Sequence, residues 1–213
     1  MTAALKEFVN GLTGTKAPGP SATFTVFHIF YALELMSQKT MGRNKLAKEL
    51  SVGEGAIRTI INRLVDAELM DTSKEGCSLT TKGKSIWKKF EEVYPKRFEV
   101  PKTDLTTSEF NYAFLIKNRG HKVKSGIDQR DAAIVAGAKR ALVIVKNKGH
   151  LRIESVSENI DEEFPEDAAK LLKNTETEEN DVIVIAGGES ILKAKRGAFA
   201  AAWSLLEGET KMH

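Results

Sequence analysis

Apolar positions in the first half of the chain recur at helical spacing in short segments. Residues 23–36 are apolar on more than one face, which predicts a helix covered on several sides. Residues 43–50 and 54–67 predict two short amphipathic helices, joined by the turn-like stretch SVGEG. In the second of these, Ile57, Ile61 and Leu64 share one face. The pattern therefore predicts a pair of short helices crossed by a tight turn.

A predicted hairpin follows this pair of helices. The extended segments LMDTS and CSLTT flank the turn-forming Lys74-Glu75-Gly76. Helical spacing returns over residues 81–94 and ends near Pro95. Residues 1–12 are amphipathic and precede a loop rich in Gly and Pro at 14–21. These boundaries predict an N-terminal arm at 1–20, a first domain at 21–100 and a linker at 101–108.

The second half alternates strands with helices. Strands are predicted at 109–117, 140–146, 150–155 and 181–186, and helices at 127–136, 162–174 and 189–206. The resulting order, β-α-β-β-α-β-α, favours an α/β sandwich with one mainly antiparallel sheet and helices on one face. We therefore expect an α+β protein whose second domain spans residues 109–213.

The segment 43–81 contains the parts of a winged helix-turn-helix in order: two short helices, a tight turn and a hairpin. Within it, AIRTIINRLVDAELM resembles the recognition helix and wing entry of MarR-type regulators, and Leu79-Thr80-Thr81-Lys82-Gly83 resembles their L-T-x-x-G segment. Glu68 departs from that pattern, which has a glycine there. The resemblance implies that residues 21–100 form a winged helix that binds duplex DNA.

The whole layout is similar, more loosely, to archaeal two-domain winged-helix proteins whose C-terminal domain has no assigned function. The segment RDAAIVAGA at 130–138, leading into the strand that follows, carries this second resemblance. It implies an architecture and no chemistry.

Candidate DNA contacts follow from position on the predicted elements. The N-terminal part of a recognition helix enters the major groove, where arginine pairs with guanine and asparagine with adenine. We expect base contacts from Arg58, Thr59 and Asn62. Phosphate contacts are expected from Arg63, Arg43 and Lys45, and contacts to the flanking backbone from Lys74 at the wing tip and from Lys82 and Lys84 after it.

The second domain contains a weaker candidate site, for a small anionic effector. A basic loop supplies Lys117, Arg119, Lys122 and Lys124, and Gly187-Gly188 follows a strand, where backbone N–H groups can hold an anion. The basic loop alternatively adds contacts to nucleic acid. A homodimer is expected too, with the apolar helix at 23–36 and the segment 197–203 as candidate surfaces or as ordinary core.

No residue set predicts catalysis, a cofactor or a metal. The single cysteine, Cys77, and the four histidines lack metal-ligand spacing, and the Gly83-Lys84-Ser85 segment has Ser78 where a P-loop needs glycine. No apolar run approaches the roughly 20 residues that span a bilayer, so we expect a cytoplasmic protein with no membrane partner. The net charge of +3 says little about partners.

These observations predict a DNA-binding transcription regulator whose C-terminal domain binds an effector or forms a dimer, and not an enzyme. Two alternatives stay open, because a fold does not fix a function. One is an adaptor that binds RNA or protein through the winged helix. The other is an enzyme in residues 108–213 with the winged helix as an appendage.

Overall fold

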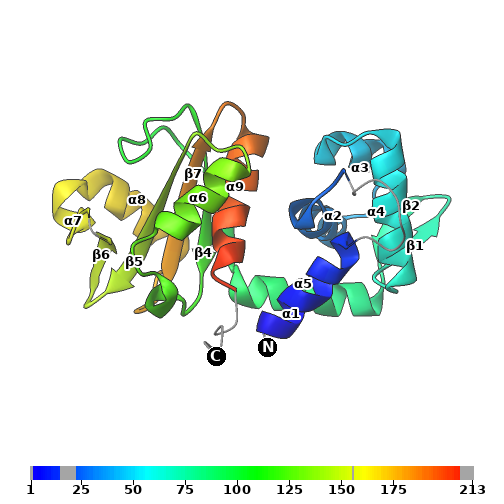
Figure 1. The fold of residues 1–213 in the computed structure, drawn as a ribbon, viewed down its shortest axis with the longest axis horizontal. Helices are drawn as coiled ribbons and strands as arrows, with labels where there is room; N and C mark the ends of the chain where they lie inside the picture. The colour runs from blue at the N-terminus through cyan, green and yellow to red at the C-terminus, as the bar shows by residue number, and fades with distance from the viewer. Residues whose placement is uncertain (1, 15–22, 155, 207–213) are drawn as a thin grey trace. The chain divides into compact units, whose positions relative to one another are not determined.

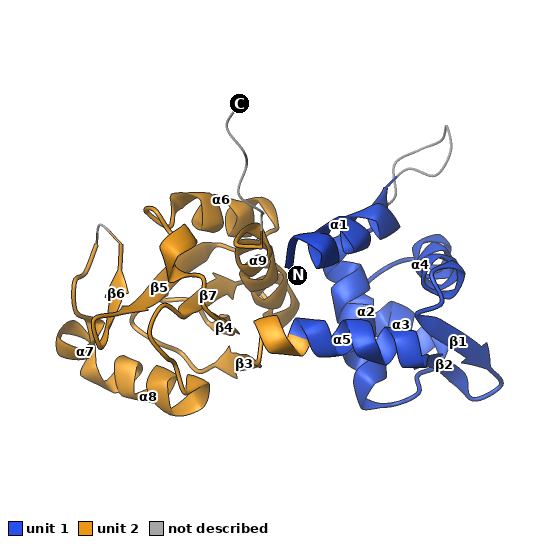
Figure 2. Cartoon of the chain, turned by 90° about the horizontal axis from the view of Figure 1, so that it is seen from below, with its two compact units in different colours: residues 1–90 blue, residues 91–213 orange. Residues whose placement is uncertain are grey.

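The computed structural model describes residues 2–14, 23–154 and 156–206. The chain divides into two compact units, residues 1–90 and 91–213 (Figure 2). Helices accompany two antiparallel sheets, so the α+β class is confirmed. None of the helices in the described ranges combines the length and apolar character that crossing a bilayer requires.

The first unit is mainly helical, with one small hairpin (Figure 1). Its elements are α1 (Thr2–Thr13), α2 (Val26–Gln38), α3 (Arg43–Leu50), α4 (Glu54–Asp66), β1 (Met70–Ser73), β2 (Gly76–Leu79) and α5 (Thr81–Val93). Met41 forms an antiparallel bridge with Cys77, which adds a one-residue third strand to the hairpin. The predicted elements of a winged helix are therefore present in the predicted order.

Helix α2 is the centre of this unit. Phe30 and Leu33 are fully buried, and the Phe30 ring lies 5.6 Å from Trp87 and 5.2 Å from Phe90 between centroids. Both aromatic partners belong to α5. Helix α2 is thus apolar all round because its own unit covers it, which favours the ordinary-core alternative for this helix.

Residues 2–13 are part of the first unit and not a separate arm. Leu5, Val9 and Leu12 of α1 are buried, and α1 packs against α2. The predicted arm at 1–20 is therefore wrong for this stretch, because its apolar face has a partner. The loop predicted at 14–21 lies, apart from Gly14, outside the described residues.

The second unit is built on a five-stranded sheet. Its elements are β3 (Lys96–Val100), β4 (Phe110–Ile116), a 3-10 turn η1 (Gly120–Lys122), α6 (Ile127–Val135), β5 (Arg140–Asn147), β6 (His150–Ile153), α7 (Ile160–Glu163), α8 (Pro165–Thr175), β7 (Val182–Gly188) and α9 (Ile191–Ser204). The strand order is β3-β4-β7-β5-β6, and every neighbouring pair is antiparallel.

Helices cover both faces of this sheet, as Figure 2 shows for α6 and α9 on one side and α7 and α8 on the other. Leu115 and Ile185 pack in one cluster with Leu171 of α8. On the opposite face the Phe114 ring lies 6.2 Å from Phe199 of α9. The mainly antiparallel sandwich is confirmed, while the expectation of helices on one face is wrong. Residues of 197–203 such as Phe199 pack on this sheet, which favours the ordinary-core alternative for this segment.

The boundary between the units lies earlier than predicted. Strand β3 pairs with β4, with Phe98 opposite Ala113, so residues 96–100 belong to the second unit and not to the winged helix. The predicted linker at 101–108 is instead the β3–β4 connection. Thr103 and Thr106 in it are buried, and the Asp104 N–H donates to Asp167 Oδ2 at 3.2 Å. The extra strand, together with two helices, α7 and α8, in place of the one predicted at 162–174, changes the order of this unit to β-β-α-β-β-α-α-β-α.

Candidate nucleic-acid interface

A short left-handed turn sets the angle between α3 and α4. Ser51 ends α3 with φ of 53°, and its N–H donates to carbonyls of the preceding turn. Gly53 then precedes α4 in extended conformation. Leu46 of α3 and Ile57 and Leu64 of α4 are buried, and this burial fixes which face of each helix points inward. The remaining face of α4 is left to solvent.

Three residues predicted to read bases lie together on that outer face. Arg58, Thr59 and Asn62 are all exposed. The Thr59 hydroxyl donates to the Gly55 carbonyl at 3.0 Å, which orients the side chain along the helix. The structure thus brings the predicted base contacts to one surface without covering them from their own unit.

Glu54 belongs to the same surface and was missed in the sequence. Its Oε1 lies 3.0 Å from Nη2 of Arg58, with both side chains mostly exposed. The signal was available, because Glu and Arg four residues apart on a helix are neighbours. An exposed pair of this kind contributes only about 0.5 kcal/mol, so a stronger anion can displace Glu54 from the guanidinium.

The residues predicted to contact phosphate differ in whether they already have an ion-pair partner. Arg43 and Lys45 in the first turn of α3, Lys74 in the wing turn and Lys84 of α5 are exposed. Lys82 is held 2.9 Å from Glu68 Oε2. A phosphate has to displace Glu68 from Lys82, as a stronger anion has to displace Glu54 from Arg58.

Glu68 occupies the position where the winged-helix pattern has glycine, and it keeps the glycine-like backbone. Its φ is +59°, in the left-handed region. The hydrogen bond from Lys82 lowers the pKa of the Glu68 carboxyl. The turn between α4 and β1 is therefore retained without glycine.

Arg63 is buried, and the prediction that it contacts phosphate is wrong. Only 9% of the residue is exposed. Its Nη1 donates to the Leu12 carbonyl at 2.6 Å, and its guanidinium carbon lies 5.1 Å from the centroid of the Phe24 ring. Leu12 is in the last turn of α1, where carbonyls lack intrahelical partners. Arg63 thus caps α1 from α4.

We expect Arg63→Ala to lower the free energy of unfolding of the first unit by about 2–3 kcal/mol, because a buried carbonyl loses a charged donor. The first unit can be followed by Trp87 fluorescence in urea, in a background with Trp203→Phe. Arg58→Ala removes the same side chain from an exposed site of the same helix and should cost under about 0.5 kcal/mol. Equal losses in the two variants would contradict the capping role.

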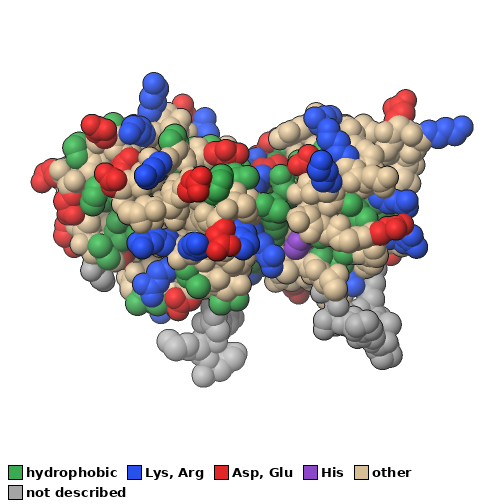
Figure 3. Space-filling view, turned by 90° about the horizontal axis from the view of Figure 1, so that it is seen from above, with side chains coloured by type: hydrophobic (Ala, Val, Ile, Leu, Met, Phe, Trp, Pro, Cys, Tyr) green, Lys and Arg blue, Asp and Glu red, His purple; other side chains and the backbone are tan. Residues whose placement is uncertain are grey.

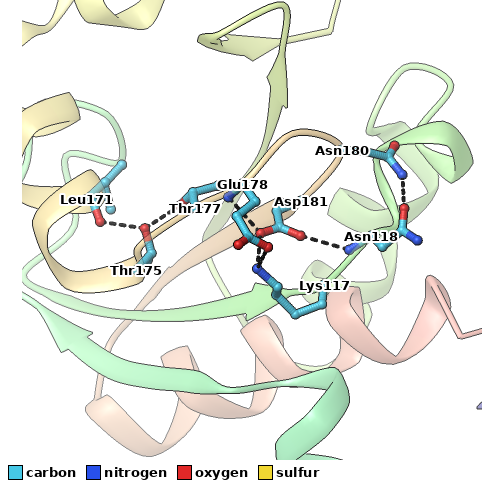
Figure 4. A network of polar contacts seen from close by, with 8 residues as sticks. All are labelled: Lys117, Asn118, Leu171, Thr175, Thr177, Glu178, Asn180 and Asp181. Atoms are coloured by element: carbon cyan, nitrogen blue, oxygen red, sulfur yellow. Dashed lines mark hydrogen bonds and ion pairs between the residues drawn. The ribbon is translucent and has the colours of Figure 1, made fainter.

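The predicted effector loop of the second unit is engaged in its own contacts. Lys117 Nζ lies 2.7 Å from both Asp181 Oδ2 and Glu178 Oε2, and the Asn118 N–H donates to Asp181 Oδ1 (Figure 4). Burial acts to lower the pKa of Lys117, but the hydrogen bonds that its ammonium donates to the two carboxylates, together with their negative charge, outweigh burial and raise the pKa. The loop is therefore bound to the α8–β7 connection by acidic side chains of the same chain.

The other basic residues of the loop differ in exposure. Arg119 and Lys122 are half-buried and Lys124 is exposed. The Arg119 N–H donates to the Asn180 carbonyl at 2.8 Å. On the face of the second unit in Figure 3, at left, acidic and basic side chains are interspersed.

Gly187 and Gly188 lie inside β7 and not in a loop after it. They pair with Asn111 and Phe110 of β4, so their backbone belongs to the sheet. A Cβ on Gly187 would lie 2.2 Å from Ser108 Oγ, and one on Gly188 would lie 2.9 Å from the Ala194 nitrogen. Close packing requires both glycines, and the prediction of an anion-binding turn is wrong.

The two halves of the predicted effector site are also far apart. In the β4–β7 register, Ile116 opposes Val182 and Phe110 opposes Gly188. The basic loop follows Ile116, so it lies at the opposite end of β7 from the glycines, about 20 Å away at some 3.4 Å per residue. Among the described residues, no group of three His, Cys, Asp or Glu side chains is placed to hold a metal.

Comparisons with known proteins support the two-part layout. Residues 29–85 match a family model described as the N-terminal domain of PH0730-like proteins, and residues 107–205 match a domain of unknown function, DUF4443. No curated protein matches the chain. The hypothetical protein PH0730 from Pyrococcus horikoshii OT3 has a similar structure, with a TM-score of 0.69 and 27% identity over 85% of this chain and 92% of that one.

These matches bear out the resemblance to archaeal two-domain proteins at the level of layout. The matched regions correspond to the two units of the chain, with residues 29–85 in the first and 107–205 in the second.

Proposed function

We propose that this protein is a transcription regulator that binds duplex DNA through α4 and the β1–β2 wing. The observation that carries the proposal is the exposed polar face of α4, with Arg58, Thr59 and Asn62 together on it. The MarR-type resemblance of the same segment supports the same role. In this mode the N-terminal half of α4 enters the major groove, where Arg58 reads guanine and Asn62 reads adenine.

Glu54 refines the expected chemistry of this face. Its carboxylate repels phosphates and therefore opposes binding in a wrong register, while cytosine N4 offers it a donor. When Arg58 pairs with guanine, Glu54 is released next to it. We therefore expect the preferred DNA site to contain a guanine, read by Arg58, close to a cytosine, read by Glu54.

Phosphate contacts position the helix and carry the salt dependence. Arg43, Lys45, Lys74 and Lys84 are exposed cations of the same unit. Each lost phosphate contact should reduce the slope of log affinity against log salt by about 1, with little change in sequence preference.

The experiment is fluorescence anisotropy of the full chain with duplex DNA selected from a random pool, and with structured RNA, across a salt series. We expect Arg58→Ala with Asn62→Ala to weaken binding to the selected duplex at least about tenfold, because each bidentate base contact contributes about 1–3 kcal/mol of discrimination. Lys88→Ala, an exposed site on α5, serves as the matched control and should leave affinity nearly unchanged.

Two results would overturn the proposal. One is the absence of duplex binding at low salt. The other is duplex binding that the double variant leaves intact. Tight binding to structured RNA without duplex binding would identify an RNA adaptor instead.

A further inference from the structure

Helix α6 has one face inside the second unit and one face in solvent. Gln129 and Ala133 are buried, on the side that packs against α9. On the other side, Ile127 is 49% exposed, Ile134 43% and Val135 89%. Scattered exposed aliphatic residues are ordinary, but these three lie within about 100° of the circumference of one nine-residue helix, with Ile127 and Ile134 nearly in line.

Two charged residues lie halfway along the helix, on either side of the line through Ile127 and Ile134. Arg130 and Asp131 are 57% and 64% exposed in their side chains, and Arg130 Nε lies 3.6 Å from Asp131 Oδ1. At about 100° per residue, Ile127 and Ile134 share nearly one line along the helix. Arg130 then lies about 50° to one side of that line and Asp131 about 50° to the other. The face is therefore an apolar ridge with a cation on one flank and an anion on the other.

We propose that this α6 face is the surface through which two copies of the chain associate. A two-fold axis parallel to α6 brings Ile127 and Ile134 against their counterparts. The same axis places Arg130 of each copy opposite Asp131 of the other, because it exchanges the two flanks. One patch thus supplies both halves of an isologous interface.

The charge pattern selects a second copy over other occupants. A nucleic-acid backbone carries only negative charge and leaves the Asp131 flank facing like charge, and an acidic or basic peptide likewise leaves one of the two flanks facing like charge. A second copy satisfies both flanks at once. One face of a nine-residue helix is a small contact surface, and interfaces below about 1,200 Å² are typical of weak complexes, so we expect a dimer that forms reversibly and depends on protein concentration.

The inference does not depend on the proposed DNA binding, since it concerns the second unit alone. Sedimentation velocity of the full chain over a wide concentration range tests it without DNA. We expect a monomer–dimer equilibrium. Arg130→Asp and Asp131→Arg should each raise the dimer dissociation constant at least about tenfold, because each places like charges on facing flanks.

A mixture of the two variants distinguishes this face from any other. Mixed dimers pair two cations with two anions, so an equimolar mixture should regain association that neither variant has alone. Lys173→Asp, a charge reversal at an exposed site of α8, is the matched control and should associate like the wild type. A wild-type chain that stays monomeric at every concentration, or a dimer that both variants leave intact, would overturn the proposal.

Discussion

Gly83→Ala is expected to unfold the first unit or to lower its free energy of unfolding by about 3 kcal/mol, the upper range for overpacking in a core. A Cβ on Gly83 would lie 2.0 Å from the Leu69 carbonyl oxygen and 3.0 Å from its carbon. Both atoms are backbone, so no side-chain rotation relieves the overlap. Helix α5 must move away from the start of the wing, or the wing must deform.

Gly55→Ala is the matched control for Gly83→Ala. It is the same substitution in a helix of the same unit, and no atom lies within 4 Å of the added Cβ. We expect it to stabilise the unit by about 0.5–1 kcal/mol, since alanine is the better helix former. Urea unfolding followed by Trp87 in a Trp203→Phe background measures both. A loss at Gly83 no larger than a few tenths of a kcal/mol would show that the contact is not as close as described.

Asp181→Ala is expected to have an effect of similar size on the second unit, lowering its free energy of unfolding by about 3–5 kcal/mol. Asp181 is 1% exposed and accepts hydrogen bonds from the Asn118 and Glu178 N–H groups, both at 2.9 Å, besides its ion pair with Lys117. Its removal leaves two backbone donors without their acceptor and a half-buried ammonium with a single carboxylate.

Glu178→Ala tests whether burial is the reason. Glu178 lies at the same 2.7 Å from Lys117 Nζ, but 76% of its side chain is exposed, against 2% for Asp181. Solvent screening should hold its contribution below about 1 kcal/mol. Trp203 fluorescence in a Trp87→Phe background follows this unit. Equal losses of unfolding free energy in Asp181→Ala and Glu178→Ala would show that the two carboxylates act through charge alone and that burial has no part.

The helix-turn-helix was predictable because its signals are local. Ile57, Ile61 and Leu64 recur at helical spacing, and the same stripe determines that Arg58 and Asn62 point outward. The burial of Arg63 was not predicted, because this residue lies only about 60° around the helix from Ile60, at the border of the apolar stripe. Which way a border residue turns depends on what packs there. The partner is Leu12, 51 residues away, and no local pattern shows it.

The fold of the second unit was harder to predict from the sequence, because the wrong expectations concern contacts between segments far apart in the chain. Strand β3 reads KRFEV, a short edge strand with two exposed and three half-buried residues, so its apolar signal is weak. The face of the sheet that each helix covers depends on strand order, which periodicity does not contain. Gly187 and Gly188 fit the sequence pattern of a strand followed by an anion-binding turn. Their pairing with Asn111 and Phe110, and the close approach of Ser108 and Ala194, show that they belong to the strand.

The position of β7 in the sheet also determines when the second unit can fold. Strands β4 and β5 both pair with β7, which is the last strand in the sequence, while β3 and β6 lie at the two edges. During synthesis, β4 and β5 therefore emerge from the ribosome well before the strand that joins them. The first unit is complete by residue 90 and can fold while the second is still being made. A chain that stops before residue 182 would carry a folded first unit attached to two unjoined hairpins, exposing apolar strand edges that favour aggregation.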